Sequence, residues 1–200
     1  PEATYGGQSA IFDISDNGIA VGFASTSLSQ EALDYIAEED GGCADPDRLL
    51  SVPIEVCIQQ ISENMYNAEA FKWVLDQNGI VSSEALGQLV TPHADDTREY
   101  ISYAQAVNIH GVAVGYAHGW WDENETSPSD DEARSIYGVV FKNGEVTDFT
   151  DDHSEYFNSR ANDINNNGIA VGHVETYING SLRQKFYYVD TNVEQMEMVF

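Results

Sequence analysis

The spacing that most resembles a chemical site is a run of alternating acidic and amide residues late in the chain. Asp163, Asn165 and Asn167 stand at every second position and are followed by Gly168, as at the start of a calcium-binding loop. A complete EF-hand loop also needs a glutamate at its twelfth position, where Val174 stands. Two interpretations are therefore open: a shorter calcium-binding hairpin, or side chains that bond the backbone of a turn.

A second group of candidate calcium ligands lies in the acidic stretch between residues 119 and 134. Carboxylate oxygens are ligands that Ca²⁺ prefers, so convergence of these side chains would create a calcium site. A solvated loop has the same composition. The candidate ligands are Asp122, Glu123, Asp130 and Asp131. Calcium is accordingly the one cofactor that the sequence suggests.

Two adjacent tryptophans, Trp120 and Trp121, come directly before this acidic stretch. Exposed indole rings next to carboxylates are suited to stacking on a sugar, which makes the pair a candidate ligand-binding platform. Large aromatic side chains also fill the space between packed sheets. The sequence supports both interpretations, and the packing role is the simpler one.

The sequence contains no nucleophile elbow, phosphate-binding loop, zinc-peptidase helix or Cys/His pattern for catalysis. Its many carboxylates leave glycoside hydrolysis open, because spacing along the chain does not give spacing in space. We therefore expect a non-catalytic binding or scaffold protein of unknown ligand. The alternatives are a glycan-processing enzyme that uses acidic residues of the insertions, and a calcium-stabilised surface protein.

The charge balance restricts the partners. The chain of 200 residues has 34 Asp and Glu against 8 Lys and Arg, a formal net charge of −26. Such a surface repels the phosphates of nucleic acids and anionic membranes. With no apolar run of about 20 residues, we expect no nucleic-acid partner and no membrane insertion, and a protein or glycan as the partner.

Cysteine usage points to an oxidising compartment. Cys43 and Cys57 are the only two cysteines, and no histidine or second cysteine pair stands at zinc spacing around them. A bridge between them would close a loop of about 15 residues, worth about 3 kcal/mol in the chain-entropy model. In the cytosol they would be two ordinary thiols. We predict a disulfide and a secreted or cell-surface protein.

The elements that carry these residues come from an internal repeat. Aligning Gly18, Gly111 and Gly168 brings three copies of one motif into register, each continuing with Ile-Ala-Val-Gly or Val-Ala-Val-Gly. Glycine after a polar residue, between β-branched residues, is typical of a β-hairpin turn with positive φ. The small second strand predicts the close approach of a neighbouring sheet. The three copies are "DISDNGIAVGF" from Asp13, "AQAVNIHGVAVGY" from Ala104 and "DINNNGIAVGH" from Asp163.

A second strand pair follows each hairpin. Its third strand carries large residues at alternate positions, in residues 71–73, 139–141 and 186–188. The fourth strand is expected in residues 80–81, 146–149 and 193–196. One unit is thus four antiparallel strands, and residues 1–200 form a single all-β repeat domain. The expected units are residues 9–90, 104–150 and 159–200.

The first unit carries the largest insertion, residues 25–67. "LSQEALDYIAEED" has apolar residues at helical spacing, with Ser27 or Ser29 as the N-cap. A second short helix is expected in "VCIQQISENMY", whereas the stretch between the cysteines, with Pro46 and Pro53, is expected to be irregular. The insertion is thus predicted to be partly helical and to hold the disulfide.

The repeat resembles that of secreted bacterial HAF-repeat proteins and a related uncharacterised gammaproteobacterial family. The family hairpin "A-x-D-I-N-x-x-G-x-x-V-G" matches "ANDINNNGIAVG" from Ala161, and its "A-F-x-W…N-G" strand pair matches "EAFKWVLDQNG" from Glu69. The middle copy departs, with Ala106 in place of the aspartate and Val139 in place of an aromatic residue. The resemblance covers most of the chain outside the insertions. It implies a β-propeller-like array and extracellular export, and no established activity.

A closed propeller typically needs at least four blades, and this chain has about three. The resemblance therefore predicts either an open array or a ring that a second chain or further repeats complete.

Overall fold

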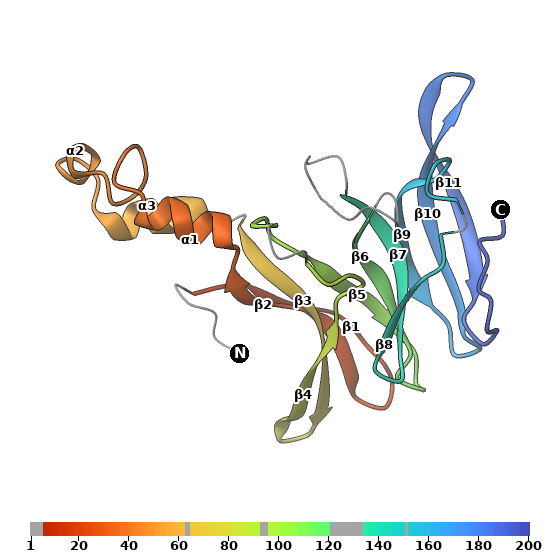
Figure 1. Cartoon of the computed structure of the whole chain (residues 1–200). Coiled ribbons are helices and arrows are strands. Elements are labelled where there is room, and N and C mark those ends of the chain that lie inside the picture. The colour runs from red at the N-terminus through yellow and green to blue at the C-terminus, as the bar shows by residue number, and fades with distance from the viewer. Residues whose placement is uncertain (1–5, 63–64, 93–95, 121–133, 151) are drawn as a thin grey trace.

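The computed structural model describes residues 6–62, 65–92, 96–120, 134–150 and 152–200. In these ranges the chain forms three antiparallel sheets that follow one another like the leaves of a fan (Figure 1). The first sheet consists of β1 (Ser9–Ile14), β2 (Ile19–Leu28), β3 (Tyr66–Asp76) and β4 (Gly79–Gly87), the second of β5 (Ser102–Val107), β6 (Ala113–Trp120), β7 (Arg134–Lys142) and β8 (Glu145–Asp148), and the third of β9 (Phe157–Ile164), β10 (Ile169–Ile178) and β11 (Ser181–Asp190).

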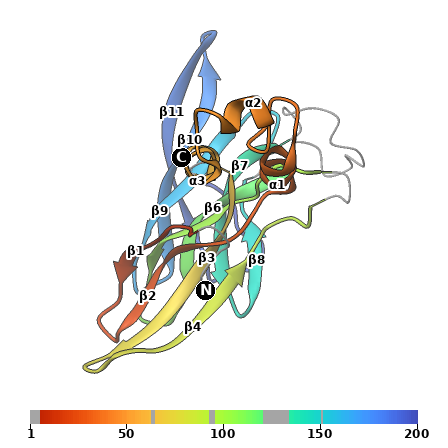
Figure 2. The ribbon, with the colours of Figure 1, turned by 90° about the vertical axis from the view of Figure 1, so that its left-hand side faces the viewer.

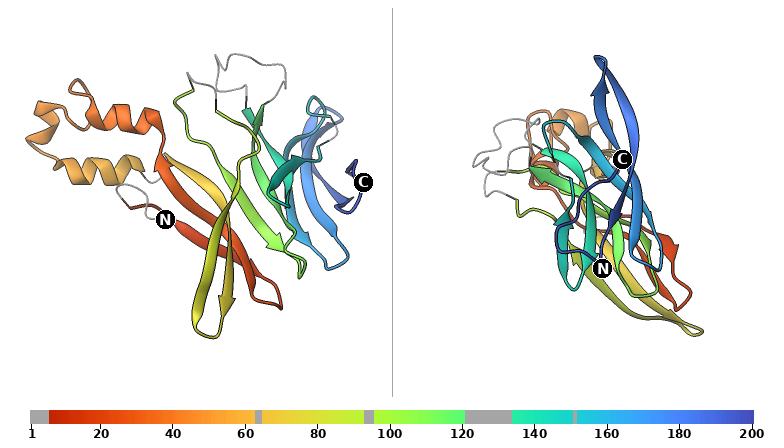
Figure 3. Two further views of the ribbon diagram at one scale, coloured as in Figure 1. Left: turned by 60° about the horizontal axis from the view of Figure 1, so that its bottom comes forward. Right: turned by 90° about the vertical axis from the view of Figure 1, so that its right-hand side faces the viewer.

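The sheets do not close on one another within the described part of the chain. The first and third sheets lie at opposite ends of the fan, with the second sheet between them (Figure 3). The finding is therefore an all-β array of three sheets, with four, four and three strands.

The predicted fourth strand of the last unit, residues 193–196, is wrong. Only one bridge, between Tyr188 and Val199, lies beside β11. The turn after β11 lacks the Asn-Gly pair of the first two units, and its residues bond back to the neighbouring hairpin. The Thr191 amide and hydroxyl both donate to the Gly168 carbonyl at 2.9 and 2.8 Å, and the Asn192 side chain donates to the Asn167 carbonyl at 2.8 Å, so the residues after β11 are bonded to the third hairpin.

The three hairpin turns share one geometry. Gly18, Gly111 and Gly168 have φ of 83°, 76° and 79°, which confirms the prediction. The turn residue before each glycine keeps a negative φ, and the glycine amide donates to the carbonyl three residues back. These are therefore three-residue hairpin loops that end in a left-handed glycine, rather than two-residue turns.

The last glycine of each motif serves its own sheet rather than a neighbouring one. In every first strand a β-bulge lies opposite this glycine. A Cβ on Gly22 or Gly115 would lie 1.8 Å from a carbonyl oxygen of the first strand, and one on Gly172 would lie 2.0 Å from it. The bulged strand therefore occupies the space beside this glycine, and the neighbouring sheet packs on the valine of the small second strand, at Val21 and Val114.

Two cores lie between the sheets. One combines Val21 and Ala70 of the first sheet with the second sheet, and the other combines Val114 of the second sheet with Ile164 and Val174 of the third. Successive side chains of a strand point to opposite faces. As a result, Val21 and Val114 face the following sheet, whereas Ala113 and Ala170 face the preceding one.

The insertion projects from the ends of β2 and β3 as a small helical unit (Figures 1 and 2). α1 (Gln30–Ala37) is capped by Ser29, whose hydroxyl accepts from the Ala32 amide at 3.2 Å. α3 (Ile54–Ser62) is the predicted second helix. α2 (Pro46–Leu49), in the stretch expected to be irregular, was not predicted. The strands extend to Leu28 and from Tyr66, so the insertion is shorter than expected.

The disulfide predicted between Cys43 and Cys57 is present, and both residues are buried. It joins the chain between α1 and α2 to α3. A bridge that closes this loop restricts the unfolded chain and holds the helices of the insertion together.

Candidate functional site

The alternating residues of the third hairpin bond the turn rather than converge on a common point. The Asn165 side-chain oxygen accepts from the amides of Asn167 and Ile169 at 2.9 and 3.0 Å. The Asp163 carboxylate accepts from the Ile164 amide at 2.8 Å. These bonds support the turn-bonding interpretation, and no group of three potential metal-ligating residues occurs in the described ranges.

The other candidate metal ligands, Asp122, Glu123, Asp130 and Asp131, lie outside the described residues, as does Trp121. Their metal and sugar-binding roles stay predictions. Trp120 is described: it ends β6 and makes an edge contact with the Tyr100 ring at 6.1 Å between centroids.

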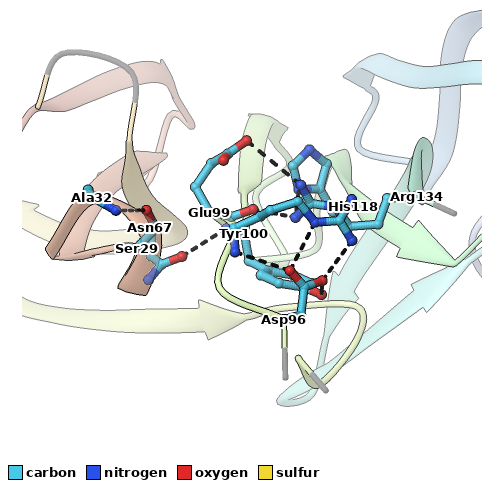
Figure 4. Close-up of polar contacts among 9 residues, drawn as sticks. Ser29, Ala32, Asn67, Asp96, Glu99, Tyr100, His118 and Arg134 are labelled. Atoms are coloured by element: carbon cyan, nitrogen blue, oxygen red, sulfur yellow. Dashed lines mark hydrogen bonds and ion pairs between the residues drawn. The ribbon is translucent and has the colours of Figure 1, made fainter. Parts of the chain in front are cut away.

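Trp120 belongs to a cluster of polar and aromatic side chains that sequence reasoning missed. We call it the junction cluster: Asp96, Arg98, Tyr100, His118, Trp120 and Arg134. Figure 4 shows Asp96, Tyr100, His118 and Arg134 of this cluster. It holds two of the eight basic residues in a very acidic chain. Its members come from the loop before β5, from β6 and from the start of β7, so no single motif of the sequence marks it.

Asp96 is the centre of the charged contacts. Its carboxylate accepts from the Arg98 guanidinium at 2.8 and 2.9 Å and from the Tyr100 hydroxyl at 2.5 Å. Burial alone would raise the pKa of Asp96, but the hydrogen bonds from Arg98 and Tyr100 outweigh it and hold this pKa well below its usual range. Burial and the Asp96 carboxylate together raise the pKa of Tyr100. The pair is thus a fixed anion with a fixed donor.

His118 is held neutral at the other side of the cluster. Burial, and then the positive charges of Arg134 and Arg98, lower the pKa of His118 to about 4. The Arg134 guanidinium lies 3.4 Å from His118 Nδ1 and 4.7 Å above the Tyr100 ring. An imidazole with so low a pKa is a weak base, so the cluster is poorly suited to proton transfer at neutral pH.

The junction cluster and its neighbours instead tie the first sheet and its insertion to the loop that leads into the second sheet. The Tyr100 amide donates to the Asn67 side chain at 2.8 Å, and the Asn67 amide group donates to Ser27 at 3.0 Å. The Glu31 amide, in the first turn of α1, donates to the Thr97 carbonyl at 2.9 Å. We interpret the cluster as a structural junction.

The outer face of the third sheet offers a different kind of site. Cross-strand pairing places Val171 beside Tyr188 and Tyr177 beside Leu182 on the face that points away from the second sheet. We call this surface the C-terminal face: Val171, Tyr177, Leu182, Phe186 and Tyr188. Phe186 is 72% exposed and Tyr177 is 64% exposed. An exposed group of large apolar side chains marks an interaction surface.

The sequence as a whole places the chain in a family. A family of proteins of unknown function, DUF3466, has a sequence model that matches residues 1–200. The chain belongs to the DUF3466 family. No curated protein matches its sequence. The family description assigns no ligand, so the function of this DUF3466 protein has to be inferred from its own surfaces.

The DUF3466 chain also has a cleft of about 670 Å³ between the first and second sheets. Its lining includes the carboxylates of Glu69, Glu84 and Glu145. Lys72 pairs with Glu84, whereas burial raises the pKa of Glu69. The cleft is thus lined by carboxyl groups in different environments, two from the adjacent strands β3 and β4 and one from β8 of the second sheet.

Proposed function

We propose that this DUF3466 protein is an extracellular, non-catalytic β-repeat protein that binds a protein partner through its C-terminal face. One observation carries the proposal. Val21 and Val114 are fully buried under the next sheet, whereas Val171, at the same motif position, is 45% exposed. A face that is covered in two units and uncovered in the third is suited to docking.

The energetics agree with docking. Burial of apolar surface stabilises a complex by about 25 cal/mol per Å² before the costs of association. Aromatic residues dominate the binding energy of protein interfaces, and Tyr177, Phe186 and Tyr188 supply three of them. The small, alternating side chains of the repeat form the support, and the large ones at the open end form the contact.

The compartment and the wider arrangement belong to the same proposal. The disulfide supports an oxidising compartment, and no helix of the described segments is long and apolar enough to cross a membrane. The hairpin motif resembles that of secreted bacterial repeat proteins. In this proposal the three sheets are a sector of a propeller-like array.

The proposal is tested by comparing surface variants in a binding experiment. The chain and its Phe186→Asp variant are immobilised, exposed to an extracellular protein fraction and cross-linked, and the captured proteins are identified by mass spectrometry. We expect a defined partner on the wild type that is lost on Phe186→Asp and kept on Leu50→Asp, a control in the insertion that is 87% exposed. Equal capture by all three proteins would contradict the proposal.

A second candidate function rests on the cleft. Glycoside hydrolysis uses two carboxyl groups in unlike environments, and the cleft is lined by Glu69, whose pKa is raised by burial, and by Glu145. The test is hydrolysis of a broad polysaccharide panel by the wild type and by Glu69→Gln. Turnover that Glu69→Gln abolishes would favour the enzyme, and no turnover leaves the binding protein ahead.

A further inference from the structure

The two contacts between sheets are formed by the same positions of the repeated motif. The first strand of the second sheet places Ala104 and Val107 against the first sheet, and both are at most 4% exposed. The first strand of the third sheet places Ala161 and Ile164 against the second sheet, and both are at most 5% exposed. In each contact the next first strand covers the valine face of the preceding sheet.

Both halves of this contact are uncovered at the ends of the fan. Ile11 and Ile14 pair with Gly22 and Ala20 as Ala104 and Val107 pair with Gly115 and Ala113. They therefore hold the same positions in the first sheet, yet they are 49% and 54% exposed. Behind them Phe71 and Trp73 stack on their own sheet, with ring centroids 5.7 Å apart. At the other end, no sheet of the described residues packs on the C-terminal face.

We infer that the occupant of the C-terminal face is a second copy of this chain, docked head-to-tail through Ile11 and Ile14 of its first strand. The inference rests on the proposed function and names its partner. The second copy is favoured because the chain itself carries the complementary half, in the same positions as in the two internal contacts. The new contact would continue an interface that the structure already shows twice.

Polar residues of the motif also form hydrogen bonds between neighbouring sheets, and their equivalents occur on the third sheet. The Asp13 carboxylate accepts from the Val107 amide at 2.9 Å, and the Asn17 side chain donates to the Ile109 carbonyl at 2.8 Å. Both bonds cross from the first sheet to the second. Asp163 and Asn167 hold these positions in the third sheet, so we expect them to form the corresponding bonds with the second copy. They would accept from the partner's Ile14 amide and donate to the partner's Asp16 carbonyl.

Each copy contributes three sheets, so a dimer joined by two such contacts would contain six sheets related by two-fold symmetry. Propellers typically have about four to eight blades. The charge of −26 on each copy opposes association, and because salt screens this repulsion, the dimer should be more stable at high ionic strength.

The test is the mass of the full chain in solution. Sedimentation equilibrium at physiological and at high sodium chloride should give a concentration-dependent species of twice the 22.1 kDa chain mass. Val171→Asp and Ile14→Asp each place a charge in both copies of the contact, and each should weaken association at least about tenfold. Both sites are exposed in the single chain, so circular dichroism should stay unchanged, and the melting temperature should fall only by the stabilisation that the dimer adds to the wild type at the same concentration. Leu50→Asp is the control that should still dimerise.

Mixing the two variants separates a head-to-tail contact from a symmetric one. An Ile14→Asp copy keeps a normal C-terminal face, and a Val171→Asp copy keeps a normal first strand. Their mixture should therefore regain a dimer held by one intact contact, weaker than the wild-type dimer. Contacts between two C-terminal faces would not be restored in this way, and that result would overturn the inference.

The failure of the inference is distinguishable from that of the proposed function. A wild type that stays monomeric at all concentrations and both salt levels overturns the second copy as the occupant. If Phe186→Asp still abolishes capture of another extracellular protein, the C-terminal face remains a binding surface for that protein. If neither dimer nor Phe186-dependent capture is found, both fail.

Discussion

At the scale of single residues, the glycine opposite each bulge is a strict requirement of the repeat. A Cβ on Gly115 would lie 1.8 Å from the Tyr103 carbonyl oxygen, which belongs to the backbone of the paired strand. Because neither strand can move without breaking the sheet, Gly115→Ala should lower the free energy of unfolding by about 2–3 kcal/mol. Urea denaturation measures the change.

The matched control is Gly144→Ala in the turn between β7 and β8. An added Cβ there meets no atom within 4 Å, although its φ is 82°, so only backbone strain of about 1 kcal/mol is expected. Equal losses at Gly115 and Gly144 would contradict the steric reason given for the bulge glycine.

His118 should make stability depend on pH in a defined window. Its pKa in the folded chain is lowered to about 4, chiefly by burial and by Arg134 and Arg98, whereas an unfolded histidine has a pKa of about 6.5. Between these values the unfolded chain binds the proton and the folded chain does not. Stability from neutral His118 is therefore lost as pH falls from about 6.5 to about 4, by up to about 2–3 kcal/mol.

The measurement is the difference in unfolding free energy between the wild type and His118→Gln as a function of pH. Taking the difference cancels the contribution to the pH dependence of the carboxylates that titrate in both proteins. Asp96, whose folded pKa is depressed, gives its full stabilisation above the ordinary pKa of an aspartate and loses it as pH falls through that value, at the lower edge of this window. A difference that stays flat between pH 6.5 and 4 would show that His118 does not resist protonation.

At the scale of elements, the disulfide should stabilise the insertion more than the sheets. The Cys43–Cys57 bridge joins segments of the helical insertion, whose cluster of Leu28, Ala32 and Tyr66 is separate from the cores between the sheets. Replacing both cysteines by serine should cost about 3 kcal/mol locally. Hydrogen exchange should show α1 and α3 losing protection while β5–β7 keep theirs.

Reductant supplies the control for this prediction. It should loosen α1 and α3 in the wild type and have no effect on the double serine variant, while intact mass after alkylation reports the two thiols. Loss of protection throughout the three sheets would instead make the insertion part of a single folding unit with them.

The sequence predicted those elements that leave a local pattern and missed those that depend on contacts between separate segments. The hairpins were predictable because a glycine with positive φ and a fixed Ala-Val-Gly strand leave a local pattern. Ser27 and Ser29 were predicted as alternative N-caps of α1, because a serine before apolar residues at helical spacing is also a local pattern, and the structure uses Ser29. The final strand was predicted wrongly: the Asn-Gly turn that precedes the fourth strand in the first two units is absent here, and Asn192 bonds instead to the Asn167 carbonyl of the third hairpin. The junction cluster was missed because Asp96, His118 and Arg134 meet only through the packing of separate elements.

The bulges show the same limit within the repeat. The motif places a glycine at one position in all three copies, and the small second strand was expected to let a neighbouring sheet approach, yet the role of this glycine beside a bulge was not foreseen. A one-residue insertion in a first strand leaves no mark in composition or periodicity, so its effect on Gly22 and Gly172 emerges only from strand register.

At the scale of the whole molecule, charge opposes both folding and association. With a formal charge of −26, like charges repel across the surface, and salt at physiological ionic strength limits this repulsion to about 8 Å. Sodium chloride should therefore raise the melting temperature of the monomeric Val171→Asp variant as well as that of the wild type. In the wild type the rise should be larger and should grow with protein concentration, because salt also favours the dimer and the dimer stabilises the fold by mass action.

Calcium at matched ionic strength separates general screening from a specific site. The third hairpin uses Asn165 and Asp163 for its own backbone, so we expect calcium to raise the melting temperature of Val171→Asp no more than sodium chloride does. A larger rise that a chelator reverses, and that Asp130→Asn with Asp131→Asn abolishes, would contradict this expectation. It would place the site in the acidic stretch, because a bound divalent ion stabilises only the folded state that assembles its ligands.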